Sequence, residues 1–156
     1  MRINRFSIYD TFGNKHDLFL KALERYREQM TASMLRDLAN SADGLPAIRR
    51  YFDLVVEHLT SPEGRKACLM INSIAEKAAE DQKIRSRCLQ NVKQLEGALR
   101  KAVVRAQDHG EIDSRRDPQE VAEYLATNVM GLNVLAKADR RRQRLIRNVE
   151  VILGTL

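Results

Sequence analysis

A length of 156 residues fits one domain with its own hydrophobic core, and two cysteines are too few for a disulfide scaffold, so the composition predicts a cytoplasmic protein with reduced thiols. No run of about 18 apolar residues is present, so the sequence predicts no membrane-spanning helix and no membrane partner. The net charge of +6 permits contact with a polyanion, but residues 1–44 carry seven Lys/Arg against six Asp/Glu and give no basic N-terminal surface.

Apolar residues recur at intervals of three and four through most of the chain, which indicates an all-α fold. The first segment reads as a short helix followed by a tight turn at Gly13. A long helix is predicted from about Lys15 to Asn40, and the turn-forming residues that follow end it. The next helix begins near Pro46, which suits a first helical turn, and ends within residues 60–64.

The middle of the chain contains a short and a long helical pattern. Residues 68–79 are mostly apolar and suit a short buried helix. A longer apolar stripe over residues 84–106 predicts a long amphipathic helix. Gly110 is a natural residue for the left-handed conformation that commonly ends a helix, so we expect this helix to close there.

The clearest helix start in the sequence lies at Asp117. Aspartate occupies the N-cap position, Pro118 follows at the first helical position, and Glu120 stands at the third. Asp139 is predicted to cap the last helix. The dense arginine run over residues 140–144 is predicted to lie on a solvated face.

The opening segment carries the most specific motif of the chain. Its residues, in order, are Ser7, Tyr9, Phe12, Gly13, Lys15, Leu18 and Phe19. This spacing resembles the end of the helix-turn-helix of TetR-family transcriptional regulators. The alternative is an ordinary helical hairpin with a tyrosine and a phenylalanine in its core.

The resemblance implies that the same segment reads operator DNA. In the family, hydroxyl groups near the end of the recognition helix contact phosphates, and the first residue of the next helix adds a cation and a free N–H. A guanidinium group suits a guanine edge, an amide suits adenine, and an aromatic ring can touch a thymine methyl. The implied DNA-binding residues are Asn4, Arg5, Phe6, Ser7, Tyr9 and Lys15.

The family module normally contains two further helices before this motif, whereas Met1 and Arg2 alone precede it here. The resemblance therefore implies that residues 1–17 are a remnant of the helix-turn-helix domain and that residues 18–156 form the ligand-binding and dimerisation domain. A helix of about eight residues is marginal without packing partners. We expect Met1 to about Phe12 to be rearranged or loosely held, and this N-terminally truncated chain to have little sequence-specific DNA affinity.

The remaining helices resemble the ligand-binding and dimerisation domain of the same family, most clearly at residues 67–73, 105–112 and 130–137. In that architecture the last two helices of each subunit form an intermolecular four-helix bundle. Gly131 within a helix costs about 1 kcal/mol relative to alanine, and close helix approach at an interface would explain it. The alternative is that both helices pack only within one core. The predicted homodimer interface comprises Gly131, Leu132, Leu135, Ile146, Val149 and Leu153.

The resemblance also implies that an unknown small-molecule effector binds among the middle helices. Asn72 and Asn128 are candidates to orient it, because they are polar residues within apolar helices. Cys68 is a candidate redox sensor because Lys66 precedes it and nearby cations activate a thiol; the alternative is a buried small hydrophobe. The predicted pocket residues, each of which can equally be ordinary core, are Tyr51, Phe52, Val55, Leu59, Met70, Ile74, Leu95, Leu99 and Tyr124.

Nothing in the sequence indicates an enzyme, a cofactor or a metal site, because the three histidines are far apart and no zinc spacing or nucleotide-binding loop is present. The resemblance implies a ligand-responsive, DNA-binding transcriptional repressor. Effector binding would tilt the predicted 15–40 helix and change the separation of two recognition helices in a homodimer. The alternative is a dimerisation or ligand-binding module without DNA-binding activity of its own.

Overall fold

The computed structural model describes residues 13–66 and 68–156, and every regular element in that part of the chain is a helix, which confirms the all-α prediction. The predictions for Asn4, Arg5, Phe6, Ser7 and Tyr9, and for the whole segment 1–12, lie outside the described residues. Among the described residues, no helix is both long and apolar enough to cross a bilayer.

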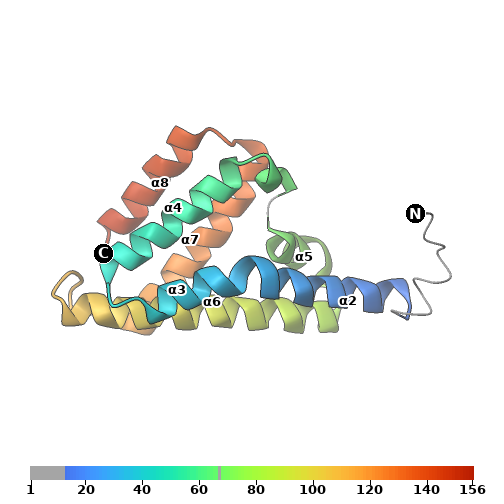
Figure 1. Ribbon diagram of the computed structural model, residues 1–156, viewed down its shortest axis with the longest axis horizontal. Coiled ribbons are helices and arrows are strands. Elements are labelled where there is room, and N and C mark those ends of the chain that lie inside the picture. The colour runs from blue at the N-terminus through green and yellow to red at the C-terminus, as the bar shows by residue number, and fades with distance from the viewer. Residues whose placement is uncertain (1–12, 67) are drawn as a thin grey trace.

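Two long helical stretches run side by side in the same direction and form the base of the molecule (Figure 1). The first consists of α2 (Lys15–Tyr26), the π-helical segment η1 (Arg27–Thr31) and α3 (Ala32–Asn40). It confirms the predicted 15–40 helix and adds a π-helical turn that the apolar stripe did not indicate. The second is α6 (Gln82–Asp108).

The remaining helices lie on one side of this base (Figure 1). The main hydrophobic core joins α3 and α6 to α4 (Leu45–Thr60), α7 (Pro118–Ala138) and α8 (Arg142–Gly154). The short helix α5 (Leu69–Lys77) follows the 3₁₀ turn η2 (Glu63–Lys66) and lies over the other half of the base. There a smaller cluster packs α5 against α2 and α6, with Leu23, Met70, Ile84 and Cys88 at its centre.

The end of α3 is fastened to the end of α6. Arg105 of α6 donates hydrogen bonds to the backbone carbonyls of Leu38 at 2.7 Å, Ala39 at 3.0 Å and Asp43 at 3.0 Å. The first two belong to the last turn of α3, whose carbonyls lack partners within the helix, and the third belongs to the turn that follows. Gly44 is needed at the turn that follows, because a Cβ there would lie 2.4 Å from the backbone of α6. This end of the base is therefore a fixed point for α3 and α4.

Two local signals predicted from the sequence are confirmed. Gly110 has φ +72°, and the N–H of Glu111 donates to the carbonyl of Ala106 at 2.8 Å, which closes α6 in a left-handed C-terminal turn. Asp117 caps α7 by accepting a hydrogen bond from the N–H of Gln119 at 2.7 Å. Both signals involve contacts within a few residues, which is why the sequence reveals them.

The arginine run before α8 forms hydrogen bonds and ion pairs that were not predicted from the sequence. Arg140 donates to backbone carbonyls at the end of α4, among them that of Leu59 at 3.0 Å. Arg141 and Arg144 pair with Asp139 at 2.6 and 2.7 Å. The predicted solvated face is thus partly wrong, since Arg140 is half-buried. Asp139 lies just before the helix and accepts from the N–H of Arg141, which is itself the N-cap residue.

These bonds give Asp139 a pH-dependent role in stability. The side chain of Arg141, then its N–H, then Arg144 hold the pKa of Asp139 well below its usual range. A carboxylate with a lowered folded-state pKa stabilises the fold above its unfolded pKa of about 3.9, and this contribution disappears as the pH falls towards the folded-state pKa. We expect Asp139→Asn to lower the urea midpoint at pH 7, and the difference from wild type to shrink below about pH 4.

Asp53 is a suitable control for that experiment, because its side chain is exposed on α4 and forms no hydrogen bond or ion pair with the described part of the chain. Asp53→Asn should leave the urea midpoint near the wild-type value at every pH. A difference between wild type and Asp139→Asn that stays constant from pH 7 to pH 3 would contradict the role assigned to these bonds.

Candidate functional site

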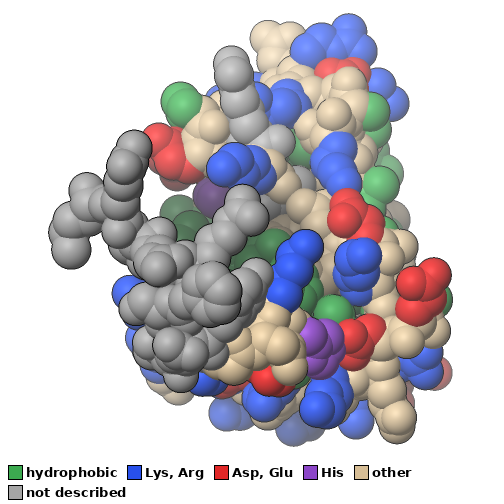
Figure 2. Space-filling model, turned by 90° about the vertical axis from the view of Figure 1, so that its right-hand side faces the viewer, with side chains coloured by type: hydrophobic (Ala, Val, Ile, Leu, Met, Phe, Trp, Pro, Cys, Tyr) green, Lys and Arg blue, Asp and Glu red, His purple; other side chains and the backbone are tan. Residues whose placement is uncertain are grey.

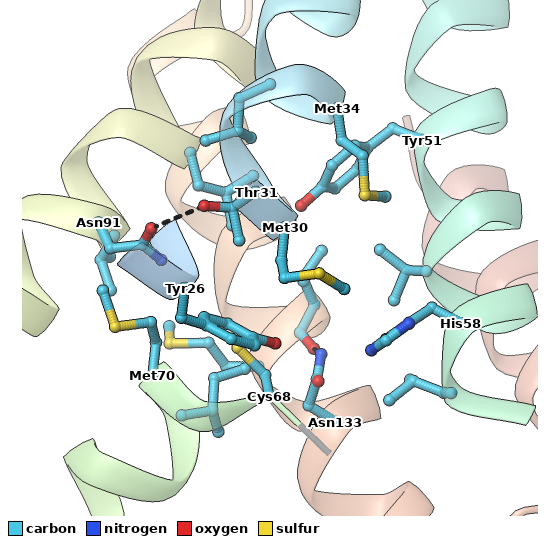
Figure 3. A pocket seen from close by; sticks show the side chains of 18 of the residues that line it. Tyr26, Met30, Thr31, Met34, Tyr51, His58, Cys68, Met70, Asn91 and Asn133 are labelled. Carbon is cyan, nitrogen blue, oxygen red and sulfur yellow. Dashed lines mark hydrogen bonds between the residues drawn. The ribbon is translucent and has the colours of Figure 1, made fainter. Parts of the chain in front are cut away.

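A cavity of about 130 Å³ lies between the base and the helices above it. Residues from α2, η1, α3, α4, α5, α6 and α7 surround it, and their side chains converge on one space (Figure 3). The lining residues are Tyr26, Met30, Thr31, Met34, Leu35, Tyr51, Val55, His58, Leu59, Cys68, Met70, Ile71, Ile74, Asn91, Val92, Leu95, Val129, Met130 and Asn133.

The described lining is rich in sulfur and carries no lysine, arginine, aspartate or glutamate. All four methionines of the described residues, Met30, Met34, Met70 and Met130, line the cavity. Methionine is unbranched and polarizable, so a wall built from it can adapt to ligands of somewhat different shape. The cavity therefore suits an apolar molecule better than an ion.

Two polar side chains of α4 face the cavity. Tyr51 and His58 are seven residues apart, so they lie on the same face of the helix, and both point into the space in Figure 3. Neither the Tyr51 hydroxyl nor the His58 ring is hydrogen-bonded to another residue in the described ranges. Burial, and then the nearby Cys68 thiol, raises the pKa of Tyr51, so its hydroxyl is a hydrogen-bond donor at neutral pH.

Tyr26 and Cys68 lie next to each other in the wall of the cavity (Figure 3). Burial, followed by the neighbouring thiol, raises the pKa of Tyr26. Cys68 is half-buried and is the N-cap residue of α5. Its role as a redox sensor stays a prediction. Cys88 is fully buried outside the cavity, and burial raises the pKa of its thiol.

Thr31 accounts for the π-helical turn. Its hydroxyl donates to the carbonyl of Arg27 at 2.7 Å, and the N–H of Ala32 donates to the same carbonyl from five residues away, which is the π-helical pattern. The Thr31 hydroxyl also lies 3.4 Å from Oδ1 of Asn91 on α6 (Figure 3). The base helix thus departs from α geometry at the point where it forms part of the cavity wall.

Three of the predicted pocket residues do not line this cavity. Phe52 and Leu99 are fully buried in the main core and do not line it, and Tyr124 is 39% exposed on the outer face of α7. Periodicity identifies the buried face of a helix, but it does not tell packed positions from those beside a gap. The predicted residues that do line the cavity are Tyr51, Val55, Leu59, Met70, Ile74 and Leu95.

Most of the polar residues that line the cavity were not predicted from the sequence. Asn133 is buried on α7, where its Nδ2 donates to the carbonyl of Val129 at 2.9 Å. A sequence signal existed, because an asparagine at a core-facing position of an apolar helix is unusual. The two asparagines chosen from the sequence lie elsewhere: Asn72 donates to the carbonyl of Lys66 and Asn128 to that of Tyr124.

The start of α2 is the described part of the predicted DNA-reading segment. Lys15 is its first residue and is exposed, beside the free N–H groups of a helix N-terminus. Nε2 of His16 lies 2.6 Å from Oδ2 of Asp81, which caps α6, so the starts of the two base helices are joined. Among the described side chains that Figure 2 shows on this end of the molecule, Lys and Arg are interspersed with Asp and Glu.

The outer faces of α7 and α8 form a shallow apolar depression. A Cβ on Gly131 would have no neighbour within 4 Å there. Among the predicted interface residues, Leu132, Val149 and Leu153 are buried within the single chain, while Gly131, Leu135 and Ile146 reach the surface, and the interface stays a prediction. The depression is lined by Tyr124, Asn128, Gly131, Leu132, Leu135, Asn148, Val151 and Ile152.

No group of three or more His, Cys, Asp or Glu side chains in the described part of the chain is arranged to hold a metal ion.

Comparison with known proteins gives consistent results. The family model described as "Tetracyclin repressor-like, C-terminal domain" matches residues 44–152. The chain is 36% identical over 155 residues to the uncharacterised HTH-type transcriptional regulator YezE of Bacillus subtilis (strain 168), covering 99% of this chain and 80% of YezE. It is 24% identical over 141 residues to the HTH-type transcriptional repressor ComR of Escherichia coli (strain K12), covering 90% of this chain and 67% of ComR.

Two solved structures are similar over nearly the whole chain. Both contain cysteine-substituted forms of the TetR family transcriptional regulator CifR in complex with 26-base-pair double-stranded operator DNA. Each aligns with a TM-score of 0.85 and 26% sequence identity over 97% of this chain. The alignments cover 80% and 79% of the CifR chains.

Proposed function

The chain belongs to the TetR family of transcriptional regulators, and we propose that it is a ligand-responsive repressor that binds operator DNA as a homodimer. The observation that carries the proposal is the position of the cavity. Its wall includes α2, η1 and α3, the continuous stretch that begins at Lys15 beside the predicted DNA-reading segment. A molecule in the cavity touches the same helix that leads to the DNA.

The contacts at the two ends of that helical stretch suggest how a signal passes along it. The end of α3 is held by three hydrogen bonds from Arg105, so displacement there is restricted. The start of α2 is joined to α6 by the contact between His16 and Asp81. Between them lies the π-helical turn, whose extra residue is a natural place for a change in helical register. An effector that favours one register over the other would redirect α2.

Homodimer formation is supported by the outer face of α7 and α8. Val151 is 69% exposed and Tyr124 is 39% exposed. Both large side chains border the same depression as Gly131, so apolar surface there is available to another chain. The open space at Gly131 allows the backbone of another helix to approach closely. Repression and operator binding are supported by the printed names of relatives: ComR is described as a repressor, and CifR was solved with operator DNA.

A selection experiment tests the proposal. The chain is incubated at low salt with random-sequence DNA duplexes, and bound DNA is amplified and sequenced over several rounds. We expect enrichment of a two-fold symmetric sequence, as a dimeric helix-turn-helix protein requires. Lys15→Glu, which reverses a charge near the phosphates, should weaken binding to all sequences similarly and reduce its salt dependence.

The outcome also decides the two alternatives raised by the sequence. Enrichment would contradict the prediction that this chain has little sequence-specific DNA affinity. If no sequence is enriched although the chain is dimeric in solution, the repressor proposal fails for it. The alternative of a dimerisation or ligand-binding module without DNA-binding activity would then be favoured.

A further inference from the structure

The size of the cavity restricts what can bind in it. Its volume is about 130 Å³. An engineered apolar cavity of about 150 Å³ in another protein holds one benzene molecule, so this space, which is partly open to solvent, accommodates roughly one ring with a small substituent towards the opening, or a short branched chain. A fused polycyclic compound needs a larger displacement of the walls than a change of methionine rotamers provides.

The charge of the lining restricts the ligand further. Among the described residues that line the cavity there is no lysine, arginine, aspartate or glutamate. An ammonium group there has no carboxylate partner among them, and a carboxylate has only the ring of His58, so a charged ligand would lose its hydration with little compensation. The methionines Met30, Met34, Met70 and Met130 offer polarizable apolar contacts instead. A neutral and mainly apolar molecule is favoured.

One polar feature of the cavity lacks a partner within the described residues. Tyr51 is 9% exposed, and its hydroxyl, like the ring of His58, forms no hydrogen bond to another side chain or backbone group there. The Thr31 hydroxyl and Nδ2 of Asn133 already donate to backbone carbonyls. The Tyr51 hydroxyl is not among the fully buried polar atoms without a partner, so it is accessible from the cavity and its donor is available to a ligand there.

We infer that the cavity binds a small neutral molecule, about the size of a substituted benzene, that carries one oxygen acceptor. This oxygen accepts a hydrogen bond from the Tyr51 hydroxyl. The ring of His58, two helical turns further along α4, faces the same space. The apolar part of the ligand lies among the methionines and the aliphatic side chains of α5 and α6. The assignment of this molecule as an effector rests on the proposed function, whereas its binding does not. A carbonyl, an ether or a hydroxyl oxygen satisfies the requirement.

Acetophenone and α-methylstyrene are matched probes for this inference, because they have nearly the same shape and differ in having C=O or C=CH₂. Titration calorimetry with the full chain should give at least about fivefold tighter binding of acetophenone, which corresponds to one net hydrogen bond. Benzoate, of similar size but charged, should show no measurable binding. Tyr51→Phe should abolish the advantage of acetophenone and leave the dissociation constant of α-methylstyrene within about twofold.

Two further variants make the result decisive. Val55→Phe places a ring between Tyr51 and His58 on α4 and should abolish binding of both neutral probes, and His58→Leu shows whether the ring of His58 contributes. Circular dichroism of each variant confirms that it is folded. Equal binding of the matched probes to wild type, an advantage of acetophenone that survives Tyr51→Phe, tight binding of benzoate, or no binding of any probe would each overturn the inference.

The probe titrations and the operator selection test different statements, so one can fail while the other succeeds. If acetophenone binds as expected but no operator is selected, the inference about the cavity holds and the repressor proposal fails. If an operator is selected but the matched probes bind equally, the repressor proposal holds and the inferred ligand class fails.

Discussion

Phe52→Ala is expected to lower the free energy of unfolding by about 3–5 kcal/mol, the usual range for removing a fully buried phenylalanine. The side chain is completely inaccessible to solvent, and its ring packs edge-on against that of Tyr51, with centroids 6.2 Å apart. Because a domain of this size has a total stability of about 5–15 kcal/mol, the loss is a large share of it. Urea denaturation followed by circular dichroism, at one protein concentration, measures the change.

Tyr124→Ala is the matched control, since both aromatic residues were predicted from the sequence to line the pocket. Tyr124 is 39% exposed, so its removal should change the unfolding free energy of the single chain little. Because Tyr124 also borders the proposed dimer interface, both variants are compared in the Val151→Glu background, which is expected to be monomeric. If Phe52→Ala proves unfolded, Phe52→Leu keeps most of the volume and should still bind α-methylstyrene, because Phe52 does not line the cavity. A small effect of Phe52→Ala, or lost probe binding in a stable Phe52→Leu variant, contradicts the placement of this residue.

Val151→Glu is expected to convert the proposed dimer into a monomer. Val151 is 69% exposed on α8 and borders the depression that contains Gly131. A glutamate buried at an interface without a partner should raise the dimer dissociation constant by about 100-fold or more, equivalent to about 3 kcal/mol. Sedimentation velocity over a range of micromolar concentrations distinguishes the two states.

Leu89→Glu is the control for that change, because Leu89 is 52% exposed but lies on α6, outside the depression. This variant should remain dimeric. A monomeric wild type at micromolar concentration contradicts the dimer proposal itself. A dimeric Val151→Glu variant, or a monomeric Leu89→Glu variant, places the interface on another face of the molecule.

The cavity illustrates why the candidate site was only partly predictable. Tyr51 and Val55 are apolar-face positions of a clear amphipathic helix, so sequence reasoning reached them. Phe52 lies on the same buried side and was chosen for the same reason, yet it packs into the core. Whether a buried position meets another side chain or a gap depends on helices from distant parts of the chain, and no local pattern records that.

The sequence by itself determined the helices, their main boundaries and the family. Asp117, Pro118 and Gly110 act through hydrogen bonds and backbone angles within a few residues, and helical periodicity is a property of each segment alone. Only the tertiary structure decided where the cavity lies, which apolar residues of α7 and α8 remain uncovered, and that Arg105 and Arg140 hold the ends of other helices. Each of these depends on contacts between different helices, such as that between Arg105 and Leu38, which are 67 positions apart, and that between Arg140 and Leu59, which are 81 apart.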